Sequence, residues 1–325
     1  MTIEPTVTNQ QFNSIIPNKK FNANFVYYLM ILVGRELNYL SKTSTAVPII
    51  NKSSFSSYEV EVPNLEIQEK IASILSSLDD KIELNRRINE NLEQQAQALF
   101  KSWFVDFEPF KDGKFVDSEL GKIPEGWQVG QISDFGKIIC GKTPSKASKD
   151  FYGGNIPFIK IPDMHNQLFV LYSEDSLSYK GSSSQQNKLL PPYSLLVSCI
   201  ATVGLVSINT KPSHTNQQIN SIIPCKSSYL FYLYLSLILM KKKLENMGRG
   251  GTATLNVNTT SFGKILVIIP KQSVLDNFSS IVSPLFKNIE NLSEQIFKLS
   301  QLRDTLLPRL MSGELAITDV NDRSI

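Results

Sequence analysis

A ten-residue segment occurs twice in this chain and constrains its architecture more than any other feature. Thr8–Pro17 reads TNQQFNSIIP and Thr215–Pro224 reads TNQQINSIIP, so nine of ten positions agree at an offset of 207 residues. The same offset, without a gap, aligns further pairs: Pro5 with Pro212, Ser54 and Phe55 with Ser261 and Phe262, Pro63 with Pro270, Ile74 with Ile281, Leu78 with Leu285, and Leu99 with Leu306. A register held over this distance indicates a duplicated structural unit.

A long helical pattern follows each repeated proline. Apolar residues recur at alternating steps of three and four: Ile71, Ile74, Leu78, Ile82, Ile88, Leu92, Ala96 and Leu99 in the first pattern, and Phe278, Ile281, Leu285, Ile289, Leu292, Ile296, Leu299, Leu302 and Leu306 in the second. Such a stripe is typical of coiled coils. We expect long helices over 64–110 and 271–315, with Asn64 and Ser273 as N-caps. Paired with each other, they would form a rod of roughly 60 Å. The alternative is two amphipathic helices, each packed on its own domain.

The residues between the helices, 111–270, have the pattern of a complete globular domain. Stretches rich in Val, Ile and Phe and broken by Gly and Pro predict strands, and a long apolar run predicts a helix: strands at Ile156–Ile161, Leu195–Ile208 and Lys264–Ile269, and a helix at Tyr229–Met247. Lys241, Lys242 and Lys243 lie toward the C-terminal end of that helix, where they would oppose its dipole favourably. The predicted fold class is therefore α+β, a mixed α/β domain with two long helices in a duplicated architecture.

The first copy of the unit is incomplete. Residues 1–63 match only the last part of the domain, because the counterpart of Lys122 would lie about 85 residues ahead of Met1. We interpret 1–63 as the C-terminal remnant of a first domain, and 316–325 as a tail. Its apolar helix candidate, Phe25–Leu40, lacks the rest of a domain to cover it. We expect this helix to dock on a partner chain or to expose an aggregation-prone patch.

Charge is unevenly distributed along the chain. Lys122–Pro270 holds 15 Lys and Arg against 7 Asp and Glu, whereas residues 64–121 hold 7 against 12. One basic domain beside an acidic segment suggests a localised polyanion-binding surface. A charge excess of this size also occurs in domains that bind no nucleic acid.

Several protein classes fit this sequence poorly. The longest apolar runs, Phe25–Val33 and Tyr229–Met240, are shorter than the roughly 20 residues that span a bilayer. The start, MTIEPTVTNQQ, lacks the features of a signal peptide. The cysteines, Cys140, Cys199 and Cys225, are odd in number and widely spaced, which fits reduced thiols. We therefore expect a cytoplasmic protein with no membrane association.

The sequence also lacks the common catalytic patterns. The two histidines, His165 and His214, have no metal-ligand spacing with a cysteine pair. The run GKTPSK lacks the glycine spacing of a nucleotide-binding loop. Carboxylates are scattered and show no nuclease-like cluster, so we expect any catalysis to come from partners.

Several local motifs complete the pattern. GKIPEGW at 121–127 opens the domain, CGKTPSK at 140–146 precedes YGGNIPF at 152–158, SWFVDFEPF at 102–110 ends the first helical pattern, and LLPRLMSGEL at 306–315 ends the second. In this order, and with the duplication, the chain resembles the specificity subunits of type I restriction–modification systems, over nearly its whole length. The resemblance implies that each duplicated unit is a target-recognition domain followed by a spacer helix. It also implies that the two helices pair antiparallel as a coiled-coil spacer.

The resemblance further implies a non-catalytic subunit whose two recognition domains each read one half of a split site on double-stranded DNA. Modification subunits, which bind S-adenosylmethionine and methylate adenine, would grip the helices. A restriction subunit, using ATP and Mg²⁺ to translocate and cut DNA, would join them, so this chain itself needs no cofactor. A second specificity chain is a further possible partner. Two alternatives stay open: a coiled-coil scaffold or adaptor that binds no nucleic acid, and a silent recombination cassette of the same family.

Candidate DNA contacts are concentrated in two loops of the basic domain. One loop carries Lys142, Thr143, Ser145, Lys146 and Lys149 next to a Gly-Gly turn, where cations, hydroxyls and close backbone approach suit phosphate. The other is glycine-rich and carries Arg249 and Thr252. A weaker candidate is Lys160. The alternative is solvated loops with ordinary lysines.

The glutamine pair Gln217 and Gln218 could in principle read adenine, since a glutamine side chain can form two hydrogen bonds to that base. However, its copy, Gln10 and Gln11, stands in a unit that should read a different half-site. A shared element suits shared architecture, so a structural role is favoured.

Overall fold

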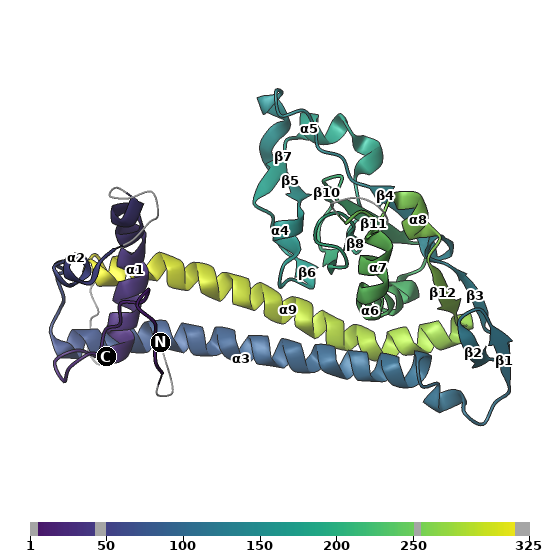
Figure 1. Ribbon diagram of the computed structural model, residues 1–325, viewed down its shortest axis with the longest axis horizontal. Helices are drawn as coiled ribbons and strands as arrows, with labels where there is room; N and C mark the ends of the chain where they lie inside the picture. The colour runs from purple at the N-terminus through teal and green to yellow at the C-terminus, as the bar shows by residue number, and fades with distance from the viewer. Residues whose placement is uncertain (1–5, 43–49, 250–254, 316–325) are drawn as a thin grey trace, which may run out of the picture. The chain divides into compact units, whose positions relative to one another are not determined.

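The computed structural model describes residues 6–42, 50–249 and 255–315. The chain divides into two compact units: unit 1 comprises Met1–Ile88 and Leu292–Ile325, and unit 2 comprises Asn89–Asn291. Two long helices, α3 (Leu65–Phe104) and α9 (Gln272–Met311), contribute to both units (Figure 1). Each is 40 residues long.

The ends of the long helices differ in part from the expected ones. Asn64 caps α3 as predicted, because its Oδ1 accepts a hydrogen bond from the Ile67 amide at 3.0 Å. The assignment of Ser273 as N-cap was wrong: α9 begins one residue earlier, and the Lys271 carbonyl accepts its first hydrogen bonds. α3 ends at Phe104 rather than at 110, and Phe107 adopts a left-handed φ of 54° ahead of η1 (Glu108–Phe110).

The core of unit 2 is a five-stranded sheet of order β4-β11-β8-β9-β6. Its strands are β4 (Gly136–Cys140), β6 (Phe169–Val170), β8 (Leu195–Ser198), β9 (Val206–Asn209) and β11 (Ile219–Pro224). β11 pairs antiparallel with both β4 and β8. The predicted single strand over Leu195–Ile208 is a pair of antiparallel strands, β8 and β9. Ala201 and Gly204 adopt positive φ in the loop between them.

Smaller elements surround this sheet. A three-stranded sheet has the order β10-β5-β7, and two strand pairs, β12-β3 and β1-β2, complete the strands. The bounds are β1 (Phe115–Ser118), β2 (Gly121–Pro124), β3 (Gln128–Gln131), β5 (Tyr152–Ile159), β7 (Asp175–Leu177), β10 (His214–Thr215), β12 (Leu266–Ile269), α4 (Ile161–Met164), α5 (Tyr179–Ser183) and α8 (Thr259–Gly263), with short 3-10 turns at η2 (Ile132–Phe135), η3 (Lys149–Phe151), η4 (Gln186–Lys188) and η5 (Ser227–Tyr229). The mixed α+β class predicted for this domain is confirmed.

The helix expected over Tyr229–Met247 is broken at Met240. It consists of α6 (Leu230–Leu239) and α7 (Lys241–Gly248). α6 is apolar and mostly buried, whereas α7 exposes its lysines, and the break lets the two helices present these different surfaces. Lys241, Lys242 and Lys243 therefore occupy the first turn of α7. Their interpretation as dipole partners at a helix C-terminus was wrong.

Aromatic side chains from both long helices fill the core of unit 2. Phe104 of α3 meets Phe278 of α9 at 4.9 Å between ring centroids, and Tyr232 of α6 at the same distance. Phe286 of α9 stacks on Phe231 with centroids 4.1 Å apart. Large rings of this kind contribute much of the apolar area buried in a core. The C-terminal half of α3 is thus anchored beside the N-terminal half of α9, an antiparallel arrangement as predicted.

Unit 1 contains α1 (Ala23–Lys42), α2 (Lys52–Ser56), the N-terminal part of α3 and the C-terminal part of α9. Phe25 and Tyr28 of α1 are buried in a cluster with Leu75 of α3 and Leu310 of α9. One face of α1 is therefore covered by this chain's own long helices. Docking of this helix on a partner chain, or exposure of an aggregation-prone patch, stays a prediction. Within the described residues, every helix is too short or too polar to cross a membrane.

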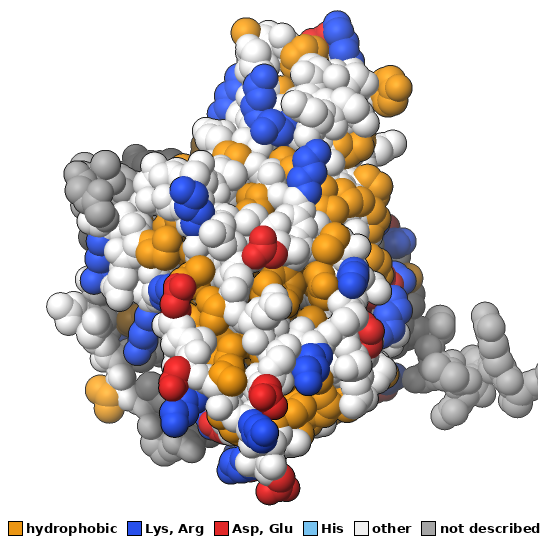
Figure 2. All heavy atoms as spheres, turned by 90° about the vertical axis from the view of Figure 1, so that its right-hand side faces the viewer, with side chains coloured by type: hydrophobic (Ala, Val, Ile, Leu, Met, Phe, Trp, Pro, Cys, Tyr) orange, Lys and Arg blue, Asp and Glu red, His pale blue; other side chains and the backbone are white. Residues whose placement is uncertain are grey.

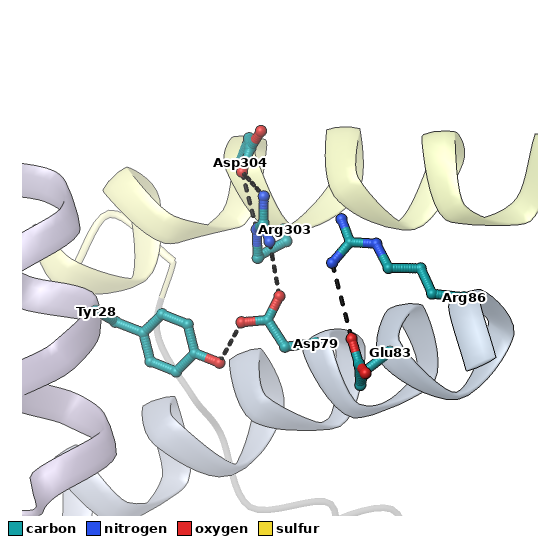
Figure 3. A network of polar contacts seen from close by, with 6 residues as sticks. All are labelled: Tyr28, Asp79, Glu83, Arg86, Arg303 and Asp304. Carbon is teal, nitrogen blue, oxygen red and sulfur yellow. Dashed lines mark hydrogen bonds and ion pairs between the residues drawn. The ribbon is translucent and has the colours of Figure 1, made fainter. Parts of the chain in front are cut away.

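A polar network adds to this cluster (Figure 3). The Tyr28 hydroxyl donates to Asp79 Oδ2 at 2.7 Å, and Arg303 Nη1 donates to Asp79 Oδ1 at 2.7 Å. Burial, together with the hydrogen bond to Asp79, raises the pKa of Tyr28 well above its usual value. The start of α3 and the end of α9 thus lie side by side in unit 1, again antiparallel.

Candidate nucleic-acid interface

Three strands of the central sheet bring their loops to one edge. In the register of the sheet, Cys140 at the end of β4 lies opposite Asn220 of β11, and Ser198 at the end of β8 lies opposite Ile219. The loops after β4 and β8 and the loop before β11 therefore emerge together. We call this the loop edge of unit 2: residues 141–149, 199–205 and 216–218.

The first loop is attached to neighbouring segments by several hydrogen bonds. The Gly141 amide donates to the Ile219 carbonyl at 3.1 Å, and the Lys142 amide donates to the Thr215 carbonyl at 2.9 Å. A Cβ at Gly141 would meet the Asn216 carbonyl oxygen at 2.1 Å, so only glycine permits this approach. Further along, the Tyr152 hydroxyl donates to the Pro144 carbonyl at 2.7 Å.

The lysines predicted on this loop lie together on its exposed side. Lys142, Ser145, Lys146 and Lys149 are all exposed, the last at the start of η3. Among the residues that the structure describes, none of these lysines forms an ion pair with a carboxylate. Thr143 is half-buried, and its hydroxyl donates to Gln217 Oε1 at 2.6 Å. The loop after β4 therefore presents exposed lysines without carboxylate partners, and hydrogen bonds hold its base.

Lys160 differs from these lysines. Its ammonium lies 2.7 Å from Asp175 Oδ2, and the side chain is largely buried. The hydrogen bond to Asp175 raises the pKa of Lys160. Its backbone amide donates to Asp163 Oδ2 at 2.8 Å. Lys160 is therefore held by β7 rather than presented with the exposed lysines.

The second predicted loop returns to the same edge. Arg249 is exposed at the C-terminal end of α7. Where the described chain resumes, the Ala201 amide donates to the Leu255 carbonyl at 3.0 Å, and the Val257 amide donates to the Cys199 carbonyl at 2.8 Å. The Asn256 amide also donates to the Gly248 carbonyl at 3.1 Å, and Asn256 pairs with Ile200, so Arg249 belongs to the loop edge as well. The other candidate in this loop, Thr252, lies outside the described residues.

The two glutamines have different environments. The Gln218 amide donates to Asn216 Oδ1 at 3.1 Å, and Asn216 Nδ2 donates to Gln218 Oε1 at 2.9 Å, a closed turn that fits the structural role predicted for the pair. Gln217 is exposed at the loop edge, where it holds Thr143. The repeat did not predict that Gln217 is exposed, because an identical residue in both copies says nothing about its exposure.

A buried serine–histidine pair lies elsewhere in unit 2. His214 Nε2 is 2.8 Å from Ser182 Oγ, but His214 is 0% exposed, so no substrate reaches it. Burial lowers the pKa of His214 to about 4. Among the described residues there is no cluster of three or more His, Cys, Asp or Glu side chains suited to a metal ion. The three cysteines are free thiols, and burial raises the pKa of Cys199 to about 11.

Charged side chains are unevenly spread on the surface. Figure 2 shows lysine and arginine side chains outnumbering acidic ones on the upper part of one face, while the two signs are mixed lower down. This distribution agrees with the basic excess counted for Lys122–Pro270.

Comparison with known proteins identifies the family. Residues 1–94 and 124–300 match the family described as type I restriction modification DNA specificity domain. The match in two stretches parallels the internal duplication.

Individual relatives agree with this match. The chain is 41% identical to the type I restriction enzyme HindI specificity subunit of Haemophilus influenzae, with 95% of this chain and 81% of the relative covered. It is 32% identical to the MjaIX specificity subunit of Methanocaldococcus jannaschii, covering 97% of this chain and 74% of the relative. The fold resembles the crystal structure of a type I restriction–modification S subunit from M. genitalium, with a TM-score of 0.58 at 16% identity over 92% of this chain and 74% of that one. The chain therefore belongs to the family of type I restriction–modification specificity subunits.

Proposed function

We propose that this chain is the DNA-reading, non-catalytic subunit of a type I restriction–modification complex, and that it directs adenine methylation by partner subunits to its target. The observation that carries the proposal is the loop edge of unit 2, where two loops far apart in the sequence bring exposed cations to one end of a sheet. Membership of the specificity-subunit family supports DNA as the polyanion.

The loop edge offers the groups that DNA binding requires. Lys142, Lys146 and Lys149 are exposed cations that suit phosphates, and the Ser145 hydroxyl can add a hydrogen bond. Arg249, and Thr252 three residues later in the sequence, would contact phosphate or a guanine edge. Lys160 would act indirectly, since its ion pair with Asp175 fixes the strand that follows the loop.

Gln217 and Thr143 are the groups here best suited to reading bases. Both side chains are polar and uncharged, and a hydrogen bond holds them together on the same edge as the lysines. Side chains of these types bond to base edges in the major groove, whereas cations on phosphates set position only. We therefore assign sequence reading to the side of the loop edge that carries this pair.

Residues 111–270 would then be a complete recognition domain, and α3 and α9 would be spacer helices. A 40-residue helix is roughly 60 Å long, against a DNA turn of roughly 34–36 Å, so a helix pair suits a subunit that holds two contacts at a fixed separation on a split site. Modification subunits would supply S-adenosylmethionine and a restriction subunit would supply ATP and Mg²⁺, acting on DNA in the cytoplasm.

A methylome tests the proposal. The chain is expressed with the modification and restriction subunits from its own locus in a host that lacks adenine methylation, and the host DNA is sequenced with detection of modified adenine. A split motif is the expected result. If the partners methylate with an intact specificity subunit but leave no motif with this chain, the DNA-reading function is wrong and a silent cassette is the better description.

A further inference from the structure

The two copies of the repeat share their helices. At the offset of 207 residues, α1 corresponds to α6 and α7, α2 corresponds to α8, and the start of α3 corresponds to the start of α9. The helices of unit 1 therefore repeat those of the C-terminal part of unit 2.

Three hydrogen bonds made by asparagine side chains are the same in both copies. The Gln11 amide donates to Asn9 Oδ1 at 3.0 Å, as the Gln218 amide does to Asn216 Oδ1 at 3.1 Å. Asn51 Oδ1 caps α2 through the Ser54 amide, as Asn258 Oδ1 caps α8 through the Ser261 amide, both at 2.8 Å.

The third shared bond joins segments distant in sequence. Asn13 Nδ2 donates to the Ile50 carbonyl at 3.1 Å, and its counterpart Asn220 Nδ2 donates to the Val257 carbonyl at 3.2 Å. Asn220 lies in β11, and its hydrogen bond holds this strand against the segment before α8. In unit 1, Asn13 is held against the segment before α2 in the same way.

The strands themselves are not formed in unit 1. Residues 12–17, the counterpart of β11, and residues 60–62, within the counterpart of β12, pair with no strand in the part of the chain that the structure describes. Their side chains are exposed accordingly: Ile15 is 45% exposed where Ile222 is 0%, and Val60 is 41% exposed where Val267 is 1%.

These exposed segments border one groove. A cavity of about 270 Å³ lies among Ile15, Ile16, Val33, Phe55, Val60 and Val62, all within unit 1. In unit 2 the equivalent residues Ile222, Phe262 and Val267 belong to the main core, together with Ile132, Phe135 and Leu195. The latter three come from η2 and β8, ahead of the repeated segment. In unit 2, therefore, the equivalent surface is covered by the N-terminal half of the same domain.

We propose that the groove of unit 1 is a docking site for the N-terminal half of a target-recognition domain carried by a separate specificity chain. The occupant would add strands equivalent to β4 and β8 on either side of residues 12–17, and one equivalent to β3 beside residues 60–62. Strand addition of this kind gains affinity from main-chain hydrogen bonds and specificity from side-chain pockets. The proposal rests on the duplication within this chain and does not depend on DNA reading.

The test uses the full chain and a probe taken from its own sequence. Residues 111–215, which contain β3, β4 and β8, are fused behind a soluble carrier protein and co-expressed with the full chain. We expect a one-to-one complex on affinity purification. Hydrogen exchange should slow in residues 12–17 and 60–62 and stay unchanged in β11 and β12.

Two double variants decide whether the groove is the site. Ile15→Asn with Val60→Asn changes two exposed groove residues and should weaken capture about tenfold or more, because each buried aliphatic side chain contributes substantially to binding. Ile31→Asn with Tyr39→Asn is the matched control: Ile31 is 46% exposed and Tyr39 is also exposed, but neither lines the groove. Capture by the control should equal that of the unchanged chain.

Three results would overturn the proposal. One is that the soluble fusion fails to co-purify with the full chain. Another is that both double variants reduce capture equally. The third is that the full chain alone is a dimer which only the groove variant dissociates, because the occupant would then be a second copy. A missing methylation motif with retained capture would count against the proposed function alone.

Discussion

Arg303 and Asp79 lie 224 residues apart in sequence, yet the Arg303 guanidinium donates to the Asp79 carboxylate at 2.7 Å and so fastens α9 to α3 in unit 1 (Figure 3). The repeat counterpart of Asp79 is Phe286, which stacks on Phe231 in unit 2. The duplicated helices have therefore kept their antiparallel pairing while the chemistry at equivalent positions has diverged.

Asp79→Ala should loosen unit 1 by about 1–2 kcal/mol, since it removes the hydrogen bonds of both Tyr28 and Arg303 at a partly buried site. Both tryptophans, Trp103 and Trp127, belong to unit 2, so their fluorescence would miss this change. Hydrogen exchange of α1 amides is the suitable measurement.

Glu83→Ala is the matched control for Asp79→Ala. Its ion pair with Arg86 is long, at 3.9 Å, and exposed, so removing it should cost less than about 0.5 kcal/mol. Equal exchange rates in the two variants would show that the network around Asp79 contributes nothing to the pairing of α3 with α9.

The repeat offers a paired test of context. Ile222→Ala should destabilise unit 2 by about 2–5 kcal/mol, because it leaves a cavity in a closed core. Ile15→Ala, the same substitution at the equivalent position, should cost less than about 1 kcal/mol, because this side chain is already 45% exposed. Urea unfolding followed by tryptophan fluorescence measures the first change, and hydrogen exchange measures the second. Similar costs would contradict the difference in burial.

His214 should make unit 2 less stable in mild acid. The unfolded chain, with a histidine pKa near 6.5, binds a proton more readily than the folded chain, where burial lowers the pKa of His214 to about 4. Its stabilising contribution is therefore complete above about pH 6.5, falls as the pH drops toward 4, and is then constant, with a total loss of up to about 3 kcal/mol.

Urea unfolding of unit 2 between pH 4 and 7, followed by tryptophan fluorescence, checks this dependence. His214→Asn should flatten the profile over that range, whereas His165→Gln, at an exposed position, should leave it unchanged. A profile that is the same with and without His214 would assign the acid sensitivity to other groups.

Replacing Lys142, Lys146 and Lys149 with alanine should weaken binding to all DNA sequences. The slope of log affinity against log salt concentration should fall by roughly 1 per lysine. Titrations with duplex DNA at several salt concentrations measure this slope. The matched control replaces three exposed lysines of the long helices, Lys81, Lys101 and Lys298. An equal loss in both triple variants would mean that net charge, not the loop edge, governs binding.

Gln217→Ala should instead change which DNA is preferred, since this group is assigned to base reading. We expect the salt slope to stay the same and discrimination between target and non-target sequences to decrease by about 1–3 kcal/mol. Its repeat counterpart Gln10→Ala is the comparison. If the affinity for DNA falls while discrimination between target and non-target sequences is kept, Gln217 has the structural role predicted from the repeat instead.

Much of the architecture could be predicted from the sequence because it depends on local or periodic signals. The apolar stripe predicted both long helices and their pairing, and the repeat revealed the duplication. The antiparallel orientation came from the family resemblance. The Asn9 and Asn216 turns form alike in both copies, because an asparagine side chain bonds to an amide two residues on whatever surrounds it. The loop lysines were found as a cluster since they are adjacent in sequence.

Tertiary structure decided what these nearly identical segments become. The last six residues of TNQQINSIIP form β11, the strand between β4 and β8, while the last six of TNQQFNSIIP are a mostly exposed segment outside any sheet. A strand needs partners for its backbone hydrogen bonds, and the partners come from elsewhere in the chain. Local sequence could not predict that Arg249 lies near the loop after β8, nor that Lys160 forms an ion pair with Asp175. Each contact depends on which strands lie next to one another in a sheet.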